Sequence, residues 1–176
     1  MGASEFDDEY SESLETEFRK LQGALLSDRV ELLAPSEPIK LPGEATVQEA
    51  IETMVAHRRS AMVVVDPEGR LVGIFTDRDV LTRVAAQRRD PERTRLDEVM
   101  TRDPDALFPD DRICYAVNRM TSMGYRTVPL VDADRRPIGI VTVNDVVRWL
   151  AELFPEAVIN LRPGDRIKRP LEVDTG

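Results

Sequence analysis

The chain has 176 residues, of which 41% are hydrophobic and 32% charged, and its formal net charge at pH 7 is −9. Residues 1–18 hold seven acidic side chains and no basic one, whereas the rest of the chain has 24 basic and 26 acidic side chains. An acidic lead before a nearly neutral body offers no basic face, which argues against broad binding to nucleic acid or to an anionic membrane.

The sequence has one cysteine, Cys114, and one histidine, His57. They form neither an intrachain disulfide framework nor a Cys/His metal cluster. The N-terminus lacks a signal pattern, and no apolar run is long enough to span a membrane. We therefore expect a cytoplasmic protein without a metal. Neither a glycine-rich phosphate loop nor a paired catalytic set is present, so we do not expect an enzyme.

The segment 11–33 carries an apolar stripe at helical spacing, formed by Leu14, Phe18, Leu21 and Leu25. This predicts an amphipathic helix that docks either on the core of the same chain or on a partner subunit. Both alternatives stay open at this point. Residues 34–38 contain two prolines and end the helical extension.

The chain then reads as strand, helix, strand, strand, helix, and this order occurs twice. The first copy is predicted to consist of strand 39–41, a helix from Val47, strands 61–65 and 71–75, and helix 77–87. The second copy is predicted to consist of strand 106–108, a helix from Ile113, strands 127–131 and 137–141, and helix 143–154. Residues 88–100 form a charged linker between them. Wholly apolar strands indicate burial on both faces, so the fold class is α/β (α+β) with helices that cover the sheets.

The segment GIFTDRD (73–79) recurs as GIVTVND (139–145), 66 positions later. At this offset residues 41–80 lie over residues 107–146 without a gap, and eleven of the 40 positions are identical. A duplication of this extent decides the architecture, because each copy is a unit that needs a neighbour to bury its apolar face.

Each copy places a threonine three residues before an aspartate, first Thr76 and Asp79, then Thr142 and Asp145. A Ser or Thr at this distance before an acid occurs five times in the chain, and alone it predicts only a helix cap. These two pairs differ because each follows an apolar strand where a helix begins. N–H groups converge at such places and bind ligands. The carboxylate suits a ribose diol, and the hydroxyl suits ribose or phosphate.

The repeated Gly–apolar–apolar–Thr–x–x–Asp resembles the signature of cystathionine-β-synthase (CBS) domains arranged as a tandem pair, also called a Bateman module. Supporting segments are VVD (64–66), VMT (99–101) and RTVPLVD (126–132). The resemblance covers about residues 35–152 and implies two repeats related by pseudo-twofold symmetry.

Such pairs bind adenosine-containing ligands in two clefts between the repeats. The resemblance thus implies an adenine nucleotide, AMP or ATP foremost, as a ligand rather than an obligatory cofactor. It assigns the ribose hydroxyls to Asp79 and Asp145, and ribose or phosphate to Thr76 and Thr142. Further contacts expected at the ligand are the basic residues Arg126, Arg78 and Lys40 and the apolar residues Ile39, Met62, Val63, Val128 and Pro129. Since Val143 and Asn144 replace Asp77 and Arg78 in the second motif, we expect unequal clefts.

The resemblance divides the chain into an acidic helical extension (1–35), a first repeat (36–88), a linker (89–103), a second repeat (104–154) and a tail (155–176). It implies a regulatory or sensory module that signals through the shape of a homodimer or through an effector protein. One alternative is a ligand-free dimerisation or scaffold module, and another is a pair that binds S-adenosylmethionine or NAD. The residues expected either at the dimer interface or in the core are Val146, Val147, Leu150 and Phe154 with Val80, Leu81 and Val84.

Overall fold

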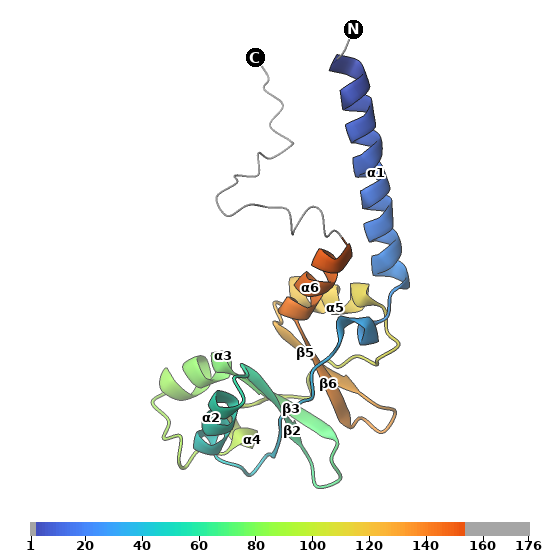
Figure 1. Ribbon diagram of the computed structural model, residues 1–176. Coiled ribbons are helices and arrows are strands. Elements are labelled where there is room, and N and C mark those ends of the chain that lie inside the picture. Colours follow the sequence, from blue (N-terminus) through green and yellow to red (C-terminus); the bar gives the residue numbers. More distant parts are fainter. Residues whose placement is uncertain (1–2, 154–176) are drawn as a thin grey trace.

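The computed structural model describes the backbone of residues 3–153 and the side chains of residues 15–153 (Figure 1). The predictions for Phe154, for residues 155–176 and for the side chain of Leu14 lie outside these described residues. A long helix, α1 (Ala3–Ser27), stands out from a body that is built from two hairpins with helices against them.

Both repeats have the predicted order of elements, with one strand reduced. The first repeat consists of β1 (Lys40–Pro42), α2 (Val47–Ala56), β2 (Ala61–Val65), β3 (Leu71–Thr76), α3 (Asp77–Asp79) and the π-helix η2 (Val80–Ala85). The second repeat consists of α5 (Ile113–Ser122), β5 (Thr127–Val131), β6 (Pro137–Thr142) and α6 (Val143–Leu153). The predicted strand 106–108 is only a single parallel bridge between Leu107 and Leu130.

The predicted linker is not irregular throughout, because it contains a short helix and leads into a strand. Helix α4 (Leu96–Val99) buries both of its end residues in the core of the first repeat. Strand β4 (Thr101–Arg102) follows at once and pairs antiparallel with β3. By sequence β4 belongs to the approach to the second repeat. In space it completes the first sheet, in which β1 runs parallel to β2 and the order is β1-β2-β3-β4.

The second repeat receives a matching segment from the approach to the first. The N–H of Ser36 donates to the carbonyl of Ile140 at 3.0 Å, and the N–H of Ile140 donates back at 2.9 Å. Ser36 stands 66 positions before Arg102, which pairs with Gly73 on β3. Each hairpin is therefore extended by the chain that leads into the other repeat.

This exchange explains the glycine that begins each repeated motif. A Cβ placed on Gly73 would overlap Sδ of Met100, which directly precedes β4. A Cβ on Gly139 would lie 3.0 Å from Cβ of Pro35, on the segment that crosses β6. The glycines leave room for the crossing chain, and neither is part of a phosphate loop.

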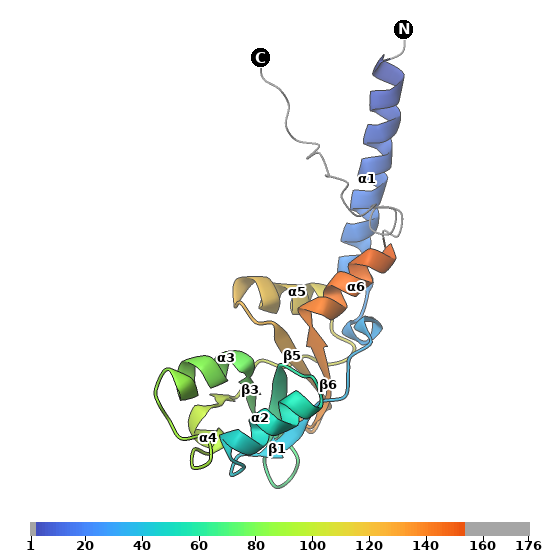
Figure 2. The same cartoon turned by 60° about the vertical axis from the view of Figure 1, so that its left-hand side comes forward.

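Strand β2 is buried on both of its faces, as its wholly apolar sequence predicts. Met62 and Val64 pack in the core that α2 and α4 form on the first sheet. Val63 points the other way and packs with Val131 and Ile140 of the second repeat. The two sheets thus share a core between them, and Figures 1 and 2 show the helices of each repeat lying against its own hairpin.

The N-terminal extension is attached to the second repeat at the end of α1. Leu21 and Leu25 pack against the core of that repeat, next to the short 3-10 helix η1 (Val30–Leu33). Arg112 donates to the carbonyls of Leu26 and Ser27 at 2.9 Å each, and so satisfies carbonyls that a helix end leaves free. Of the two alternatives for the apolar stripe, docking on the chain's own core holds for this part. Phe18, one turn earlier, is 61% exposed.

The helices that follow the two motifs also have some of their apolar residues in the cores and others exposed. Four of the residues expected either at a dimer interface or in the core lie in the cores or against them: Val80, Val84, Val146 and Leu150. Leu81 and Val147, which are 66 positions apart, are 67% and 56% exposed.

The crossing at Gly73 predicts a specific cost for adding one methyl group. We expect Gly73→Ala to lower the free energy of unfolding by about 1–3 kcal/mol, because the new Cβ overpacks against buried Met100. Gly23→Ala is the matched control, since a Cβ there meets nothing within 4 Å on helix α1. It should raise the free energy of unfolding by up to about 1 kcal/mol. Urea unfolding of both variants measures the contrast, and equal effects would contradict the crossing.

Candidate functional site

The motif of the first repeat closes on itself where β3 ends and α3 begins. Asp79 is only 7% exposed, and its Oδ2 accepts hydrogen bonds from the N–H of Thr76 at 2.9 Å and from Oγ1 of Thr76 at 2.7 Å. In return, Oγ1 of Thr76 accepts from the N–H of Asp79 at 3.3 Å. This reciprocal capping box holds the carboxylate in one orientation.

The motif of the second repeat has the same geometry. Oδ2 of Asp145 accepts from the N–H and from Oγ1 of Thr142, both at 2.7 Å. In each motif the other carboxylate oxygen, Oδ1, faces an arginine of the following helix. Nε of Arg83 lies 3.2 Å from Asp79, and Nη1 of Arg148 lies 3.3 Å from Asp145. Both motifs are therefore helix caps, and in both only Oδ1 remains to be shared with a further partner.

A cavity of about 260 Å³ opens beside Asp79, between the two repeats. This volume is near the lower end of the range for small-molecule sites, roughly 300–1,000 Å³. The first repeat contributes Thr76, Asp79 and the arginines Arg78 and Arg83, and the second contributes Arg126 from the turn before β5. The apolar part of the wall consists of Ile74, Pro104, Met123 and Pro129, with the ring of Tyr125.

The equivalent place beside Thr142 is almost closed. Its cavity measures about 20 Å³, which is room for about one water molecule. Arg59 lines it, and Nη1 of Arg59 donates to Oγ of Ser36 at 3.0 Å. At the position of Arg59 the first cleft has Tyr125, 66 residues later. The smaller cleft is thus the one whose wall contains a long arginine side chain, held by its hydrogen bond to Ser36.

The two clefts also differ in charge. Arg78 and Arg126 line the open cleft, and their side chains have no hydrogen-bond or ion-pair partner among the described residues. The equivalent positions in the second cleft hold Asn144 and Ser60. Three acids also line the open cleft: Asp79 lies against Arg83, Asp105 is paired with Arg119 at 3.3 Å, and Oδ1 of Asp77 accepts a hydrogen bond from the N–H of Arg78. The open cleft therefore offers two unpaired guanidinium groups to an anion.

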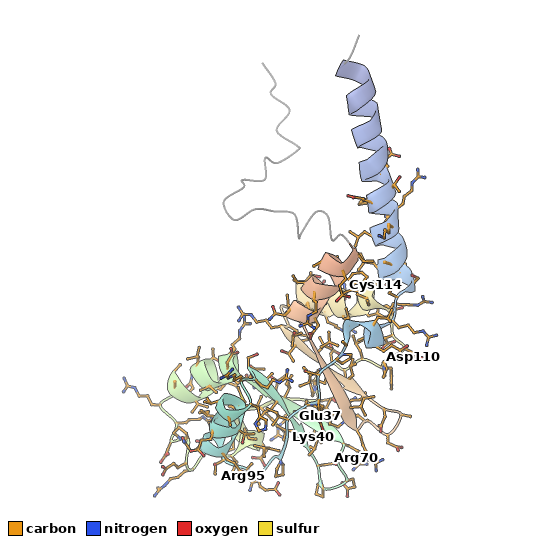
Figure 3. The ribbon with its side chains drawn as sticks, in the orientation of Figure 1. Glu37, Lys40, Arg70, Arg95, Asp110 and Cys114 are labelled. Carbon is orange, nitrogen blue, oxygen red and sulfur yellow. The ribbon has the colours of Figure 1, made fainter. Side chains whose placement is uncertain are left out.

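The structure distributes the residues that the sequence singled out over four locations. Those that line the open cavity are Thr76, Arg78, Asp79, Arg126 and Pro129. Those at the closed cleft are Ile39 and Thr142 in its wall and Asp145 bonded to Thr142. Those with 0% exposure, in the packed cores, are Met62, Val63 and Val128. Lys40 is exposed on β1, next to the segment that holds Glu37, and lies outside the walls of both cavities (Figure 3).

Tyr125 and Arg83 are among the residues of the open cleft that the sequence did not single out. Tyr125 stands directly before Arg126, so a comparison of this position with Arg59 could have indicated unequal clefts. Arg83 lies in the π-helix, where the ungapped alignment of the repeats places it opposite a tryptophan.

Comparison with known proteins agrees with the duplicated architecture. The model of the family described as CBS domain matches residues 31–86 and again residues 96–152. The chain belongs to the CBS domain family. Its two units are CBS repeats in tandem, and the open cavity lies between them.

The relatives of this CBS pair include small and larger proteins. An uncharacterized 17.7 kDa protein of Acidianus ambivalens is 28% identical over 128 residues, which are 73% of this chain and 76% of that protein. The mitochondrial CBS domain-containing protein CBSX3 of Arabidopsis thaliana is 34% identical over 107 residues, 58% of this chain. The chain spans 52% of the length of CBSX3.

Among solved structures, the CBS domain pair of protein MJ0100 superposes with a TM-score of 0.64 and 29% sequence identity. The match covers 70% of this chain and 96% of the MJ0100 pair, which was solved in complex with 5′-methylthioadenosine and S-adenosyl-L-methionine.

The described residues carry no grouping of three or more His, Cys, Asp and Glu side chains that could hold a metal ion. Within the same part of the chain, no helix combines the length and the apolar character needed to cross a bilayer.

The capping geometry predicts that Thr76 contributes to stability. We expect Thr76→Ala to lower the free energy of unfolding by about 1 kcal/mol, because it removes both hydroxyl bonds to Asp79. Thr53→Ala serves as the control, since the Thr53 hydroxyl only donates to the carbonyl of Glu49, one turn earlier in α2. That change should stay within about 0.5 kcal/mol. Thermal or urea unfolding decides, and a neutral Thr76→Ala would contradict the cap.

Proposed function

We propose that this CBS pair is a regulatory module that binds one adenine nucleotide per chain in the open cleft beside Asp79. The observation that carries the proposal is the composition of that cleft. A fixed carboxylate from one repeat and an unpaired Arg126 from the other face the same cavity of about 260 Å³. A carboxylate accepts hydrogen bonds from a ribose diol, and guanidinium groups bind phosphate.

Adenosine is the nucleoside that we propose for this site. The supporting observation is the MJ0100 pair, which resembles this chain at 29% identity and was solved with two adenosine derivatives. The apolar wall around Pro104, Met123 and Tyr125 suits a planar base, since aromatic and apolar surfaces bury such rings.

A phosphate-bearing ligand fits the charges of this cleft better than S-adenosylmethionine does. The sulfonium of S-adenosylmethionine is a cation and offers no partner to the unpaired side chains of Arg78 and Arg126, although the carboxylates of Asp77 and Asp105 also line the cleft. AMP or ATP instead supplies the anion that these arginines lack. NAD also carries phosphates, and it stays an alternative that the same titration measures.

Occupancy of one cleft follows from the differences between the repeats. Asn144 and Ser60 replace the two unpaired arginines, and Arg59 occupies the position of Tyr125. With about 20 Å³ of space, the second cleft cannot take a nucleotide without movement of Arg59. A ligand-free scaffold is the second candidate function, favoured by the capping hydrogen bonds that already occupy Oδ2 of both Asp79 and Asp145.

The proposed output is a change in a homodimer or in the binding of an effector protein. A ligand shifts such an equilibrium only if it prefers one arrangement of the two repeats. A nucleotide in the open cleft would contact residues of both repeats, so it would prefer the arrangement of the repeats in which both sets of contacts form. We place the module in the cytoplasm, because its single cysteine fits a reducing compartment.

Replacement of the two motif aspartates tests the ligand site. We expect Asp79→Asn to weaken AMP binding about 10- to 100-fold, because hydrogen bonds to a charged carboxylate are worth about 1.5–3 kcal/mol. Asp145→Asn changes the same bond pattern in the closed cleft and should leave AMP affinity within about threefold. Isothermal titration calorimetry of the full chain measures both. If AMP, ATP, S-adenosylmethionine and NAD all give no heat with the unchanged protein, the scaffold function stands instead.

Replacement of the exposed apolar pair tests the proposed dimer. Leu81→Asp and Val147→Asp together should convert the dimer to monomers, since charges buried in an apolar interface are costly. Leu32→Asp, at a similarly exposed residue on η1, should leave the mass of the dimer in solution unchanged. Analytical ultracentrifugation reports the mass, and a dimer that persists in the double variant would locate the interface elsewhere.

A further inference from the structure

The helix after the first motif contains a π-turn, whereas the helix after the second motif is a regular α-helix. The π-helix runs from Val80 to Ala85. At the offset of 66, Arg83 aligns with Trp149, and Thr82 aligns with Arg148. π-turns insert one residue into a helix and occur frequently at functional sites.

In space the correspondence is shifted by one residue. Arg83 pairs with Asp79 as Arg148 pairs with Asp145, although the spacing is four residues in the first pair and three in the second. Val84 then fills the core of the first repeat, as Trp149 fills the core of the second. The inserted residue therefore lets an arginine follow the aspartate in both repeats while the apolar contact below it is kept.

Arg83 differs from Arg148 in its surroundings. It lines the open cavity, and its Nη1 donates to the carbonyl of Val99 at 2.9 Å. Val99 ends α4, directly before the segment that crosses to the second repeat. The guanidinium of Arg83 is thus held at the cavity wall by one nitrogen while another faces Asp79.

Both carboxylate oxygens of Asp79 have partners in this structure. Oδ2 accepts two hydrogen bonds from Thr76, and Oδ1 lies against Nε of Arg83. A ribose diol that binds Asp79 competes with Arg83 for Oδ1. The Arg83 side chain is 43% exposed, so water can solvate the displaced guanidinium, whereas a ligand phosphate would replace the lost ion pair with a charge-assisted hydrogen bond. A nucleotide satisfies both groups, whereas a nucleoside takes the partner of Arg83 and returns none.

We propose that Arg83 selects a ribonucleoside phosphate over the nucleoside by exchanging Asp79 for a phosphate oxygen of the ligand. This inference rests on the proposed nucleotide binding in the open cleft. Arg78 and Arg126 attract any anion, but they have no partner to give up. Arg83 is the arginine whose pairing changes when the ribose binds, so it couples recognition of the sugar to the presence of phosphate.

The test is a titration of the full chain with AMP and with adenosine. In Arg83→Gln we expect AMP to bind at least about tenfold more weakly and adenosine to bind equally well or more tightly, because Oδ1 of Asp79 is released. The preference for AMP over adenosine therefore falls by about tenfold or more. Arg148→Gln is the matched control, since it removes the equivalent ion pair away from the open cavity, and it should leave this preference unchanged.

Each of the following results would overturn the exchange. If Arg83→Gln weakens AMP and adenosine by the same factor, Arg83 only supports the shape of the site, and nucleotide binding itself stands. If neither affinity changes, the ion pair is a surface contact without a role. If the unchanged protein binds neither ligand, or if Asp79→Asn binds AMP normally, the proposed function fails and the exchange with it.

Should Arg83→Gln fail to fold, Arg83→Lys replaces it, with the circular dichroism spectrum as the check on folding. Lysine keeps the charge but cannot span Asp79 and the Val99 carbonyl with a planar fork. We expect its preference for AMP to lie below that of the unchanged protein. An unaltered preference in Arg83→Lys contradicts the exchange.

Discussion

The chain that leads into each repeat crosses the sheet of the other repeat at a glycine, and most of the structure depends on this crossing. Met100 passes over Gly73, and Pro35 passes over Gly139, each where a side chain would clash. Because the segments are exchanged, the repeats share a core between their sheets, formed by Val63 and Leu71 with Val131 and Ile140. The open cleft is a consequence, since the crossing segment brings Pro104 of the second repeat beside Asp79 of the first.

Symmetry of the fold does not make the two clefts alike. The hydrogen bonds that Oδ2 of Asp79 accepts from Thr76 are repeated between Oδ2 of Asp145 and Thr142. What differs is the surface around the motifs, where single substitutions between the repeats remove cations and space from one side. The duplicated fold thus provides two clefts with the same motif. The side chains outside the motif decide which cleft can hold an anionic ligand.

Much of the fold could be predicted from the sequence, because the duplication and the apolar strands reflect burial that both repeats require. The motif threonines and aspartates could be identified for the same reason. The exchange of segments could not, since pairing between Ser36 and Ile140 is a long-range contact without a local pattern. Arg83 was hidden because an ungapped alignment of the repeats cannot represent the extra residue of a π-turn. The sequence also does not indicate the bond between Arg59 and Ser36, which are 23 positions apart.

A crystal structure of the chain grown with AMP tests the central claim most directly, that one cleft between exchanged repeats is the ligand site. The account predicts one nucleotide per chain, with the ribose on Oδ1 of Asp79 and the phosphate against the arginines of the open cleft. Arg59 should still be bonded to Ser36 on the other side. A nucleotide bound beside Asp145, alone or together with one beside Asp79, would contradict the account.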